Sequence, residues 1–150
     1  MDIRLDWLGC ATFRLTIDDL VVFLDAYMDR VPSAPPVGLT TAQVKKADFV
    51  LVGHAHFDHI AGAEVIAKNT GATIIGSIES GRVMREAGVS NDQIQPAQGG
   101  ENYRLSKDVN VRVYPGLHSC VWLPQPLDQT GPALGHLNLT EDEKANQGGL

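Results

Sequence analysis

The sequence predicts an α/β (α+β) fold, in which a mixed sheet begins with an antiparallel meander and carries helices on one face. Residues 3–24 hold three strand-type segments separated only by short turns, as in neighbouring antiparallel strands. From residue 40 onward, strand-type and helical segments alternate, and a helical crossover makes the strands that it joins parallel. A length of 150 residues, with 43% apolar and 20% charged residues, suits one globular domain.

The first two amino-terminal segments alternate apolar and polar residues, as half-buried strands do, and the third is a short apolar run. We expect strands over 3–8, 12–17 and 20–24. Gly9, between the first two, marks either a bend where the backbone approaches another group closely or an ordinary turn, and both interpretations stay open. Residues 26–39 contain three prolines and are predicted to form a loop. Its Tyr27 and Met28 would either line a substrate entrance or cover the core, and we favour the core.

The central part of the chain supplies the alternating strands and helices. The pattern predicts a short helix with a threonine N-cap, a buried strand, a second helix, a parallel strand and a third helix ended by Gly88. Beyond residue 90 an irregular or edge segment precedes two further strands. The short helix spans 40–46, the buried strand 48–53, the second helix 60–68, the parallel strand 72–76 and the third helix 80–87. The irregular or edge segment spans 90–100, and the two further strands span 101–105 and 109–114. We expect residues 1–120 to form the domain and residues 121–150 a loop and flexible tail.

Charge and composition exclude several classes of function. The formal net charge is −6 and the longest basic run is Lys45-Lys46, so no nucleic-acid partner is expected. Apolar runs are too short to cross a bilayer, and the start of the chain lacks the pattern of a signal peptide. Cys10 and Cys120 are far apart in sequence and indicate no disulfide framework, which favours a cytoplasmic location.

The densest group of metal-ligand side chains is His54-Ala-His-Phe-Asp-His59, which holds three of the five histidines and follows the predicted strand at 48–53. Side chains two residues apart on an extended segment share a side, so His54 and His56 can converge on one ion. Asp58 and His59 follow where the chain turns and can face a neighbouring position. Imidazole suits zinc, iron, nickel or copper, and a carboxylate keeps manganese and iron in consideration. The alternative is a solvated histidine-rich loop, but the preceding strand favours a metal site.

The same residues resemble the signature of the metallo-β-lactamase superfamily of metal-dependent hydrolases. Trp7-Leu-Gly-Cys-Ala-Thr-Phe13 and Val22-Phe-Leu-Asp25 are similar to the opening hairpin of that family. The similarity covers most of residues 3–120, and the nearest branch is that of the ascorbate-phosphate lactonase-like proteins. The resemblance implies that His54, His56 and a later histidine hold one metal, while Asp58 and His59 serve a second. It also implies that Asp25 is a supporting residue, although a plain turn aspartate would suit its position.

His118 is the expected later histidine. A single histidine is more often a surface or packed residue. His118, however, follows the strand predicted at 109–114 and a glycine, as His54 does, and the family places its next histidine after such a strand. Cys120 is either a thiolate ligand or a small buried residue, and we favour burial.

The resemblance covers only half of the family's fold, a four-layer αββα sandwich built from two similar halves. In the family the second half supplies a carboxylate that bridges the metals and one more histidine. Asp128 and His136 are the candidates in this chain, but neither follows a predicted strand. We therefore expect a fragment or truncated form, whose exposed apolar sheet face would need a partner. Formation of a homo-oligomer through that face is a hypothesis.

The function predicted from these observations is metal-dependent hydrolysis of an ester, lactone, amide or phosphoester bond in a small-molecule substrate. The nucleophile would be a metal-bound hydroxide on one or two Zn²⁺ ions, with Mn²⁺ or iron as alternatives. Asp58 would have a catalytic role by orienting the nucleophile or accepting its proton, or it would be a ligand only. The alternative function is a non-catalytic metal-binding half-domain that assembles with another chain. A redox iron site is a third and weaker hypothesis.

Overall fold

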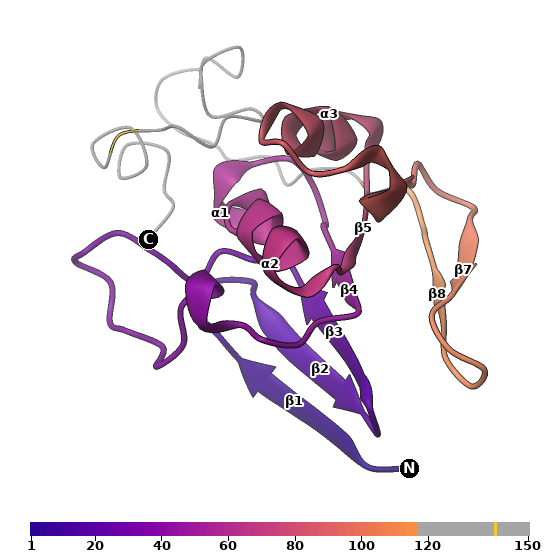
Figure 1. The fold of residues 1–150 in the computed structure, drawn as a ribbon, viewed down its shortest axis with the longest axis horizontal. Coiled ribbons are helices and arrows are strands. Elements are labelled where there is room, and N and C mark those ends of the chain that lie inside the picture. Colours follow the sequence, from indigo (N-terminus) through magenta and orange to yellow (C-terminus); the bar gives the residue numbers. More distant parts are fainter. Residues whose placement is uncertain (117–139, 141–150) are drawn as a thin grey trace.

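The computed structural model describes residues 1–116 and residue 140 (Figure 1). Its main feature is a six-stranded sheet in the order β1-β2-β3-β4-β5-β6. The first three strands are antiparallel, and β3 to β6 are parallel. The strands are β1 (Ile3–Trp7), β2 (Phe13–Ile17), β3 (Leu20–Leu24), β4 (Phe49–Leu51), β5 (Thr73–Gly76) and β6 (Ile94–Pro96). The predicted mixed sheet with an antiparallel meander is confirmed.

Short helices connect the parallel strands, and a separate two-stranded sheet follows them. The α-helices are α1 (Phe57–Ile60), α2 (Ala63–Thr70) and α3 (Ile78–Glu86), and the 3₁₀ helices are η1 (Thr41–Gln43) and η2 (Asn91–Gln93). The second sheet pairs β7 (Asn102–Arg104) with β8 (Asn110–Arg112). In the described part of the chain no helix has the length and apolar character needed to span a membrane.

The first two predicted helices differ from the structure, and each difference has a physical reason. The helix expected over 40–46 is only the 3₁₀ turn η1, because Val44 is already extended (φ −66°, ψ 117°) where the chain leads into β4. The helix expected over 60–68 is α2, which starts only at Ala63 after the N-cap Gly62, and Ile60 belongs to the separate turn α1. The φ of Gly62 is 98°, and a Cβ there would lie 2.7 Å from the carbonyl oxygen of Ala26, so only glycine fits without strain.

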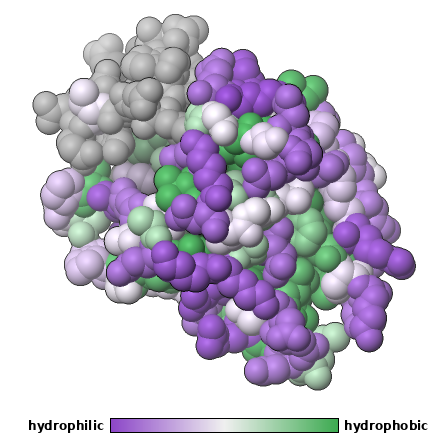
Figure 2. All heavy atoms as spheres, in the orientation of Figure 1, coloured by the Kyte–Doolittle hydropathy of each residue, from purple (hydrophilic) through white to green (hydrophobic). Residues whose placement is uncertain are grey.

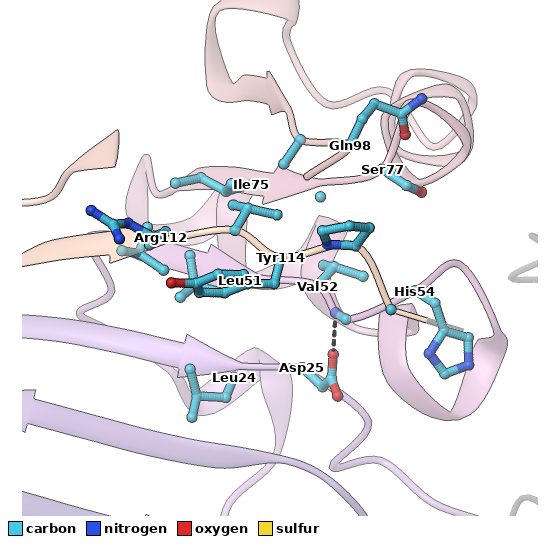
Figure 3. A pocket seen from close by; sticks show the side chains of 17 residues that line it. Leu24, Asp25, Leu51, Val52, His54, Ile75, Ser77, Gln98, Arg112 and Tyr114 are labelled. Carbon is cyan, nitrogen blue, oxygen red and sulfur yellow. Dashed lines mark hydrogen bonds between the residues drawn. The ribbon is translucent and has the colours of Figure 1, made fainter. Parts of the chain in front are cut away.

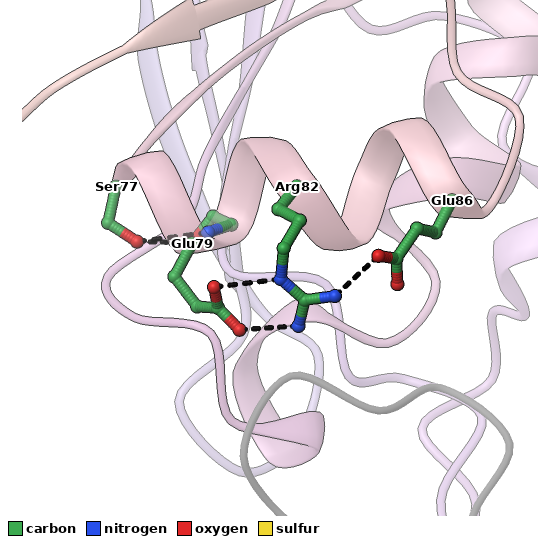
Figure 4. A network of polar contacts seen from close by, with 5 residues as sticks. Ser77, Glu79, Arg82 and Glu86 are labelled. Atoms are coloured by element: carbon green, nitrogen blue, oxygen red, sulfur yellow. Dashed lines mark hydrogen bonds and ion pairs between the residues drawn. The ribbon is translucent and has the colours of Figure 1, made fainter.

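Helix α3 starts earlier than the pattern of apolar residues predicted, because Ser77 caps it. The Ser77 hydroxyl accepts a hydrogen bond from the backbone N–H of Ser80 at 3.0 Å. On the exposed side Arg82 pairs with Glu79 at 2.6 Å and with Glu86 at 2.5 Å (Figure 4). These spacings of three and four residues place the partners one helical turn apart, so the pairs support the helix.

The main core lies between the sheet and the helices. Val21 and Phe23 of β3 alternate with residues that face the other side, and they pack in one cluster with Ile66 of α2 and Met84 of α3. Ile66 and Met84 are completely buried. The helices therefore cover one face of the sheet, as predicted.

The opposite face of the meander is apolar and partly uncovered. Ile3, Leu5 and Trp7 of β1 are 59%, 58% and 61% exposed. The antiparallel register places the apolar residues Ile17, Leu15 and Phe13 of β2 directly opposite them. The exposed apolar sheet face is therefore present in the structure, and its need for a partner stays a prediction.

Candidate metal centre

The candidate site lies where β3 and β4 end. These strands are parallel neighbours in which Leu24 pairs with Leu51, so the residues that follow them emerge at the same edge of the sheet. The backbone N–H of Asp25 donates to the carbonyl of Leu51 at 2.9 Å, which extends the ladder by one step. Gly53 and His54 follow β4 at this edge.

Asp25 connects the two loops. It has a φ of 55°, a left-handed conformation that aspartate tolerates better than most residues, and its side chain is largely buried. Its Oδ1 accepts a hydrogen bond from the backbone N–H of Gly53 at 2.8 Å (Figure 3), and its Oδ2 lies 2.6 Å from Nδ1 of His59. The structure confirms that Asp25 supports the histidine loop through hydrogen bonds.

His54 and His56 point their ring nitrogens at one another. The Nε2 of His54 lies 3.0 Å from the Nδ1 of His56. Two nitrogens on one tetrahedral zinc ion, each bonded at 2.0–2.1 Å, would be about 3.3 Å apart. One ligand atom each from His54, His56 and Asp58 lies within 4.8 Å of the other two. These three donors therefore fit a single divalent cation.

Helix α1 presents the last two candidate ligands. His56 is the residue before its first turn, and Phe57 and Ile60 are buried at 2% and 0% exposure. Because these two anchor the inner side of the turn, Asp58 and His59 are left on the outer side. The Nε2 of His59 lies 3.6 Å from Oδ2 of Asp58, and the backbone carbonyl of His59 accepts from Ala26.

The site has an electrostatic preference for positive charge. Burial lowers the pKa of His59, but the hydrogen bond to Asp25 and the charges of Asp25 and Asp58 outweigh it, so that the pKa of His59 is raised. An environment that favours an imidazolium also favours a bound cation. Burial, with the same two carboxylates, raises the pKa of the Cys10 thiol, so Cys10 stays protonated beside the site.

The loop after β3 packs under the site. Tyr27 is 1% exposed and meets Phe57 edge to face, with ring centroids 5.6 Å apart. Tyr27 and the 4% exposed Met28 cover the core, as we favoured. A Cβ on Gly9 would lie 2.8 Å from Nε of Arg30, so this glycine marks a close approach. The edge-to-face contact with Phe57 could not be foreseen, because it joins residues from two different loops.

A cavity of about 540 Å³ opens beside the site (Figure 3). Its lining includes Asp25 and His54, the apolar ends of the parallel strands, and residues 113–116 after β8. Gly116 precedes His118 by two residues. His118, Cys120, Asp128 and His136 lie outside the described residues, as does the predicted boundary between residues 120 and 121.

The structure thus brings together four of the five predicted ligands: His54, His56, Asp58 and His59. The roles of Gly53, Phe57 and Ile60 in holding them were not predicted. The spacing of Phe57 and Ile60, three residues apart with Asp58 and His59 between them, is the signal that could have indicated the helical turn.

Comparison with known proteins identifies the family. The profile of the beta-lactamase superfamily domain matches residues 21–140, more than half of the chain. The chain belongs to the metallo-β-lactamase superfamily. Its placement in the ascorbate-phosphate lactonase-like branch stays a prediction.

The match covers about half, or less, of the length of two curated relatives. It is 34% identical over 119 residues to a UPF0173 metal-dependent hydrolase of Pyrobaculum islandicum, covering 79% of this chain and 51% of the relative. Another protein of that name, from Anaeromyxobacter dehalogenans, is 39% identical over 88 residues, covering 58% and 31%. The chain therefore spans about half the length of the Pyrobaculum relative.

A solved structure shows the same fold. Igni18, a metallo hydrolase from the archaeon Ignicoccus hospitalis, matches with a TM-score of 0.63 at 23% identity, covering 78% of this chain and 50% of that one. The six-stranded mixed sheet with helices on one face is therefore half of a metallo-β-lactamase fold.

Proposed function

We propose that this chain is part of a metal-dependent hydrolase that acts on a small-molecule substrate. The observation that carries the proposal is the convergence of His54, His56 and Asp58, whose ligand atoms lie within 4.8 Å of one another at the end of β4. The names of the relatives, which describe metal-dependent hydrolases, support it. The match covers only 51% of the Pyrobaculum relative, so the hydrolytic activity is a proposal.

Four described residues would hold metal. His54, His56 and Asp58 have the spacing for one ion, and His59 with Asp58 for a second. Zn²⁺ suits this donor set best, with Mn²⁺ or iron as alternatives. Such an ion, when bound, activates water near neutral pH and polarises the bond to be cleaved.

His118 would complete the first ion's ligand set. The support is the position of Gly116, which lines the same cavity as His54. Only one residue, Leu117, separates Gly116 from His118 in the sequence.

The protein side chains have separate tasks in this proposal. Asp25 accepts a hydrogen bond from the Nδ1–H of His59 and so leaves its Nε2 free to bind metal. Asp58 would bind metal and also orient the attacking water or accept its proton. The adjoining cavity, lined by Leu24, Leu51 and Ile75, would hold the apolar part of an ester, lactone, amide or phosphoester.

A non-catalytic half-domain that binds metal and assembles with another chain is the second candidate. Two observations favour it: the match covers only 51% of the Pyrobaculum relative, and the row of Ile3, Leu5 and Trp7 is exposed. A homo-oligomer formed through this face belongs to the same proposal. For either function we propose a cytoplasmic location, supported by the free thiol of Cys10.

Metal content and turnover distinguish the two functions. The purified chain would be analysed for metal by elemental analysis and assayed on a generic ester and a generic phosphodiester. Bound metal together with turnover that His56→Ala and Asp58→Asn abolish would support the hydrolase. Asp108→Asn, which changes an exposed aspartate at the β7–β8 turn, is the matched control and should keep full activity. Bound metal without turnover would favour the half-domain, and absence of metal would contradict both.

A further inference from the structure

A second hollow, of about 410 Å³, lies on the helix-bearing face of the sheet, away from the metal centre. Four cationic side chains from three segments line it: Arg4 of β1, Arg14 of β2, and Lys45 and Lys46 of the segment before β4. These are four of only 12 lysines and arginines in a chain of net charge −6. A concentration of cations in one hollow of an acidic protein needs an explanation.

The register of the meander explains why the cations share a face. Arg4 pairs with Thr16, and Thr16 in turn pairs with Val21 of β3. Because directly paired residues point to the same side, all three face the helices. Arg14 reaches the same side through its partner Phe23.

The wall of the hollow comes from the segment that leads from η1 to β4. Val44 of this segment is 5% exposed and packs in the core with Val21, while Lys45 and Lys46 remain exposed. The segment passes in front of the meander in Figure 1, and Figure 2 shows that the surface there is mostly hydrophilic. The hollow therefore has an apolar floor and a cationic rim.

The positive charge of the two arginines is only half neutralised by their common partner. Arg14 approaches Oδ2 of Asp6 at 2.8 Å, and Arg4 approaches the same oxygen at 3.2 Å. One carboxylate thus serves two guanidinium groups, and the hydrogen bond from Arg14 is the largest cause that holds the pKa of Asp6 below its usual value.

The two lysines have carbonyl oxygens as their hydrogen-bond partners. Lys45 donates to the carbonyl of Ala42, and Lys46 to that of Asp19. One carboxylate, Asp18, also lines the hollow, but it accepts from the backbone N–H of Asp2 at 2.8 Å and faces the amino terminus at 3.9 Å. Asp48, close by, accepts from the backbone N–H of Val21 at 2.7 Å. The ammonium groups of Lys45 and Lys46 therefore keep donor capacity toward the hollow.

We propose that this hollow binds a small, multiply charged oxyanion, specifically the phosphate groups of a phosphorylated small molecule. Guanidinium groups bind phosphate oxygens through paired hydrogen bonds, and lysines add point charges. A volume of about 410 Å³ suits a small ligand. A nucleic-acid backbone suits the observations less well, because the net charge is −6 and the longest basic run in the sequence is Lys45-Lys46.

Inorganic pyrophosphate is the probe for this site. Its binding would be measured by isothermal titration calorimetry in the presence of EDTA, which removes metal from the histidine site. The double variant Lys45→Gln/Lys46→Gln changes two exposed side chains and should fold normally. Its matched control is Arg104→Gln/Lys107→Gln, which removes the same charge from the exposed β7–β8 hairpin.

The proposal predicts saturable binding that weakens about tenfold in the Lys45/Lys46 variant, because two solvent-exposed charge pairs with the ligand are lost, and stays unchanged in the control. His54→Ala should leave the binding intact, which separates this site from the metal centre. Absence of saturable binding, or equal weakening in both double variants, would overturn the proposal. Tighter binding of single-stranded DNA than of pyrophosphate, with the same sensitivity to Lys45→Gln/Lys46→Gln, would also overturn it.

Discussion

Replacing Asp25 by asparagine should weaken metal binding without unfolding the chain. Asparagine has the same shape, tolerates the left-handed backbone conformation (φ 55°), and keeps an oxygen for the Gly53 N–H at 2.8 Å. It places an amide group, however, where Asp25 now accepts from Nδ1 of His59 at 2.6 Å. An amide N–H there would make Nδ1 the acceptor and put the ring proton on Nε2, the nitrogen that faces Asp58.

The expected loss of metal affinity follows from the hydrogen bond between residue 25 and Nδ1 of His59, in which donor and acceptor exchange places. Loss of a carboxylate that orients a metal-binding histidine typically weakens metal affinity about 10- to 100-fold, or about 1.4–2.7 kcal/mol. Zinc affinity would be measured by competition with a chromogenic chelator, and the tautomer of His59 by ¹⁵N NMR of the metal-free chain. Asp108→Asn, which changes an exposed aspartate, should alter neither. Unchanged zinc affinity in Asp25→Asn, with the proton of His59 still on Nδ1, would refute the role assigned to Asp25.

Three further predictions concern stability. Ile66→Ala, at a completely buried position, should lower the free energy of unfolding by about 2–5 kcal/mol in urea titrations, and a loss under about 1 kcal/mol would contradict the described core. Gly62→Ala should cost about 2 kcal/mol or more, since φ is 98° and the new Cβ would lie 2.7 Å from the Ala26 carbonyl; an unchanged melting temperature would exclude this conformation. The lowered pKa of Asp6 means that its pairing with Arg14 stabilises the fold above the usual carboxyl pKa, and that this stabilisation disappears as the pH falls through the lowered value. Asp6→Asn should therefore destabilise by about 0.2–1 kcal/mol at pH 7 and have no effect in strong acid, and an equal effect at both pH values would contradict the ion pair.

The sequence predicted the sheet well because the sheet depends on local patterns. The alternation in residues 3–8 and 12–17 reflects a strand period of two, the apolar runs at 20–24 and before Gly53 are typical of buried strands, and the structure has strands in all these places. The helices were predicted less well. One of them starts only after Gly62, which lies against the carbonyl of Ala26, a contact between residues 36 positions apart that no local pattern contains.

In the candidate site, too, residues adjacent in sequence were predicted, whereas contacts between distant segments depended on the fold. The cluster of His54, His56, Asp58 and His59 was visible because its members are adjacent in sequence. The hydrogen bonds of Asp25 were suggested by family resemblance, and only the parallel pairing of β3 with β4 brings Asp25 to Gly53 and His59.

The central claim is that His54, His56 and Asp58 share one metal ion, and a crystal of the zinc-loaded chain measured at the zinc absorption edge would test it most directly. An anomalous peak within about 2.0–2.2 Å of Nε2 of His54 and of Nδ1 of His56, and near a carboxylate oxygen of Asp58, is the predicted result. A zinc peak bound elsewhere, or no peak with the two imidazoles still 3.0 Å apart, would contradict the claim.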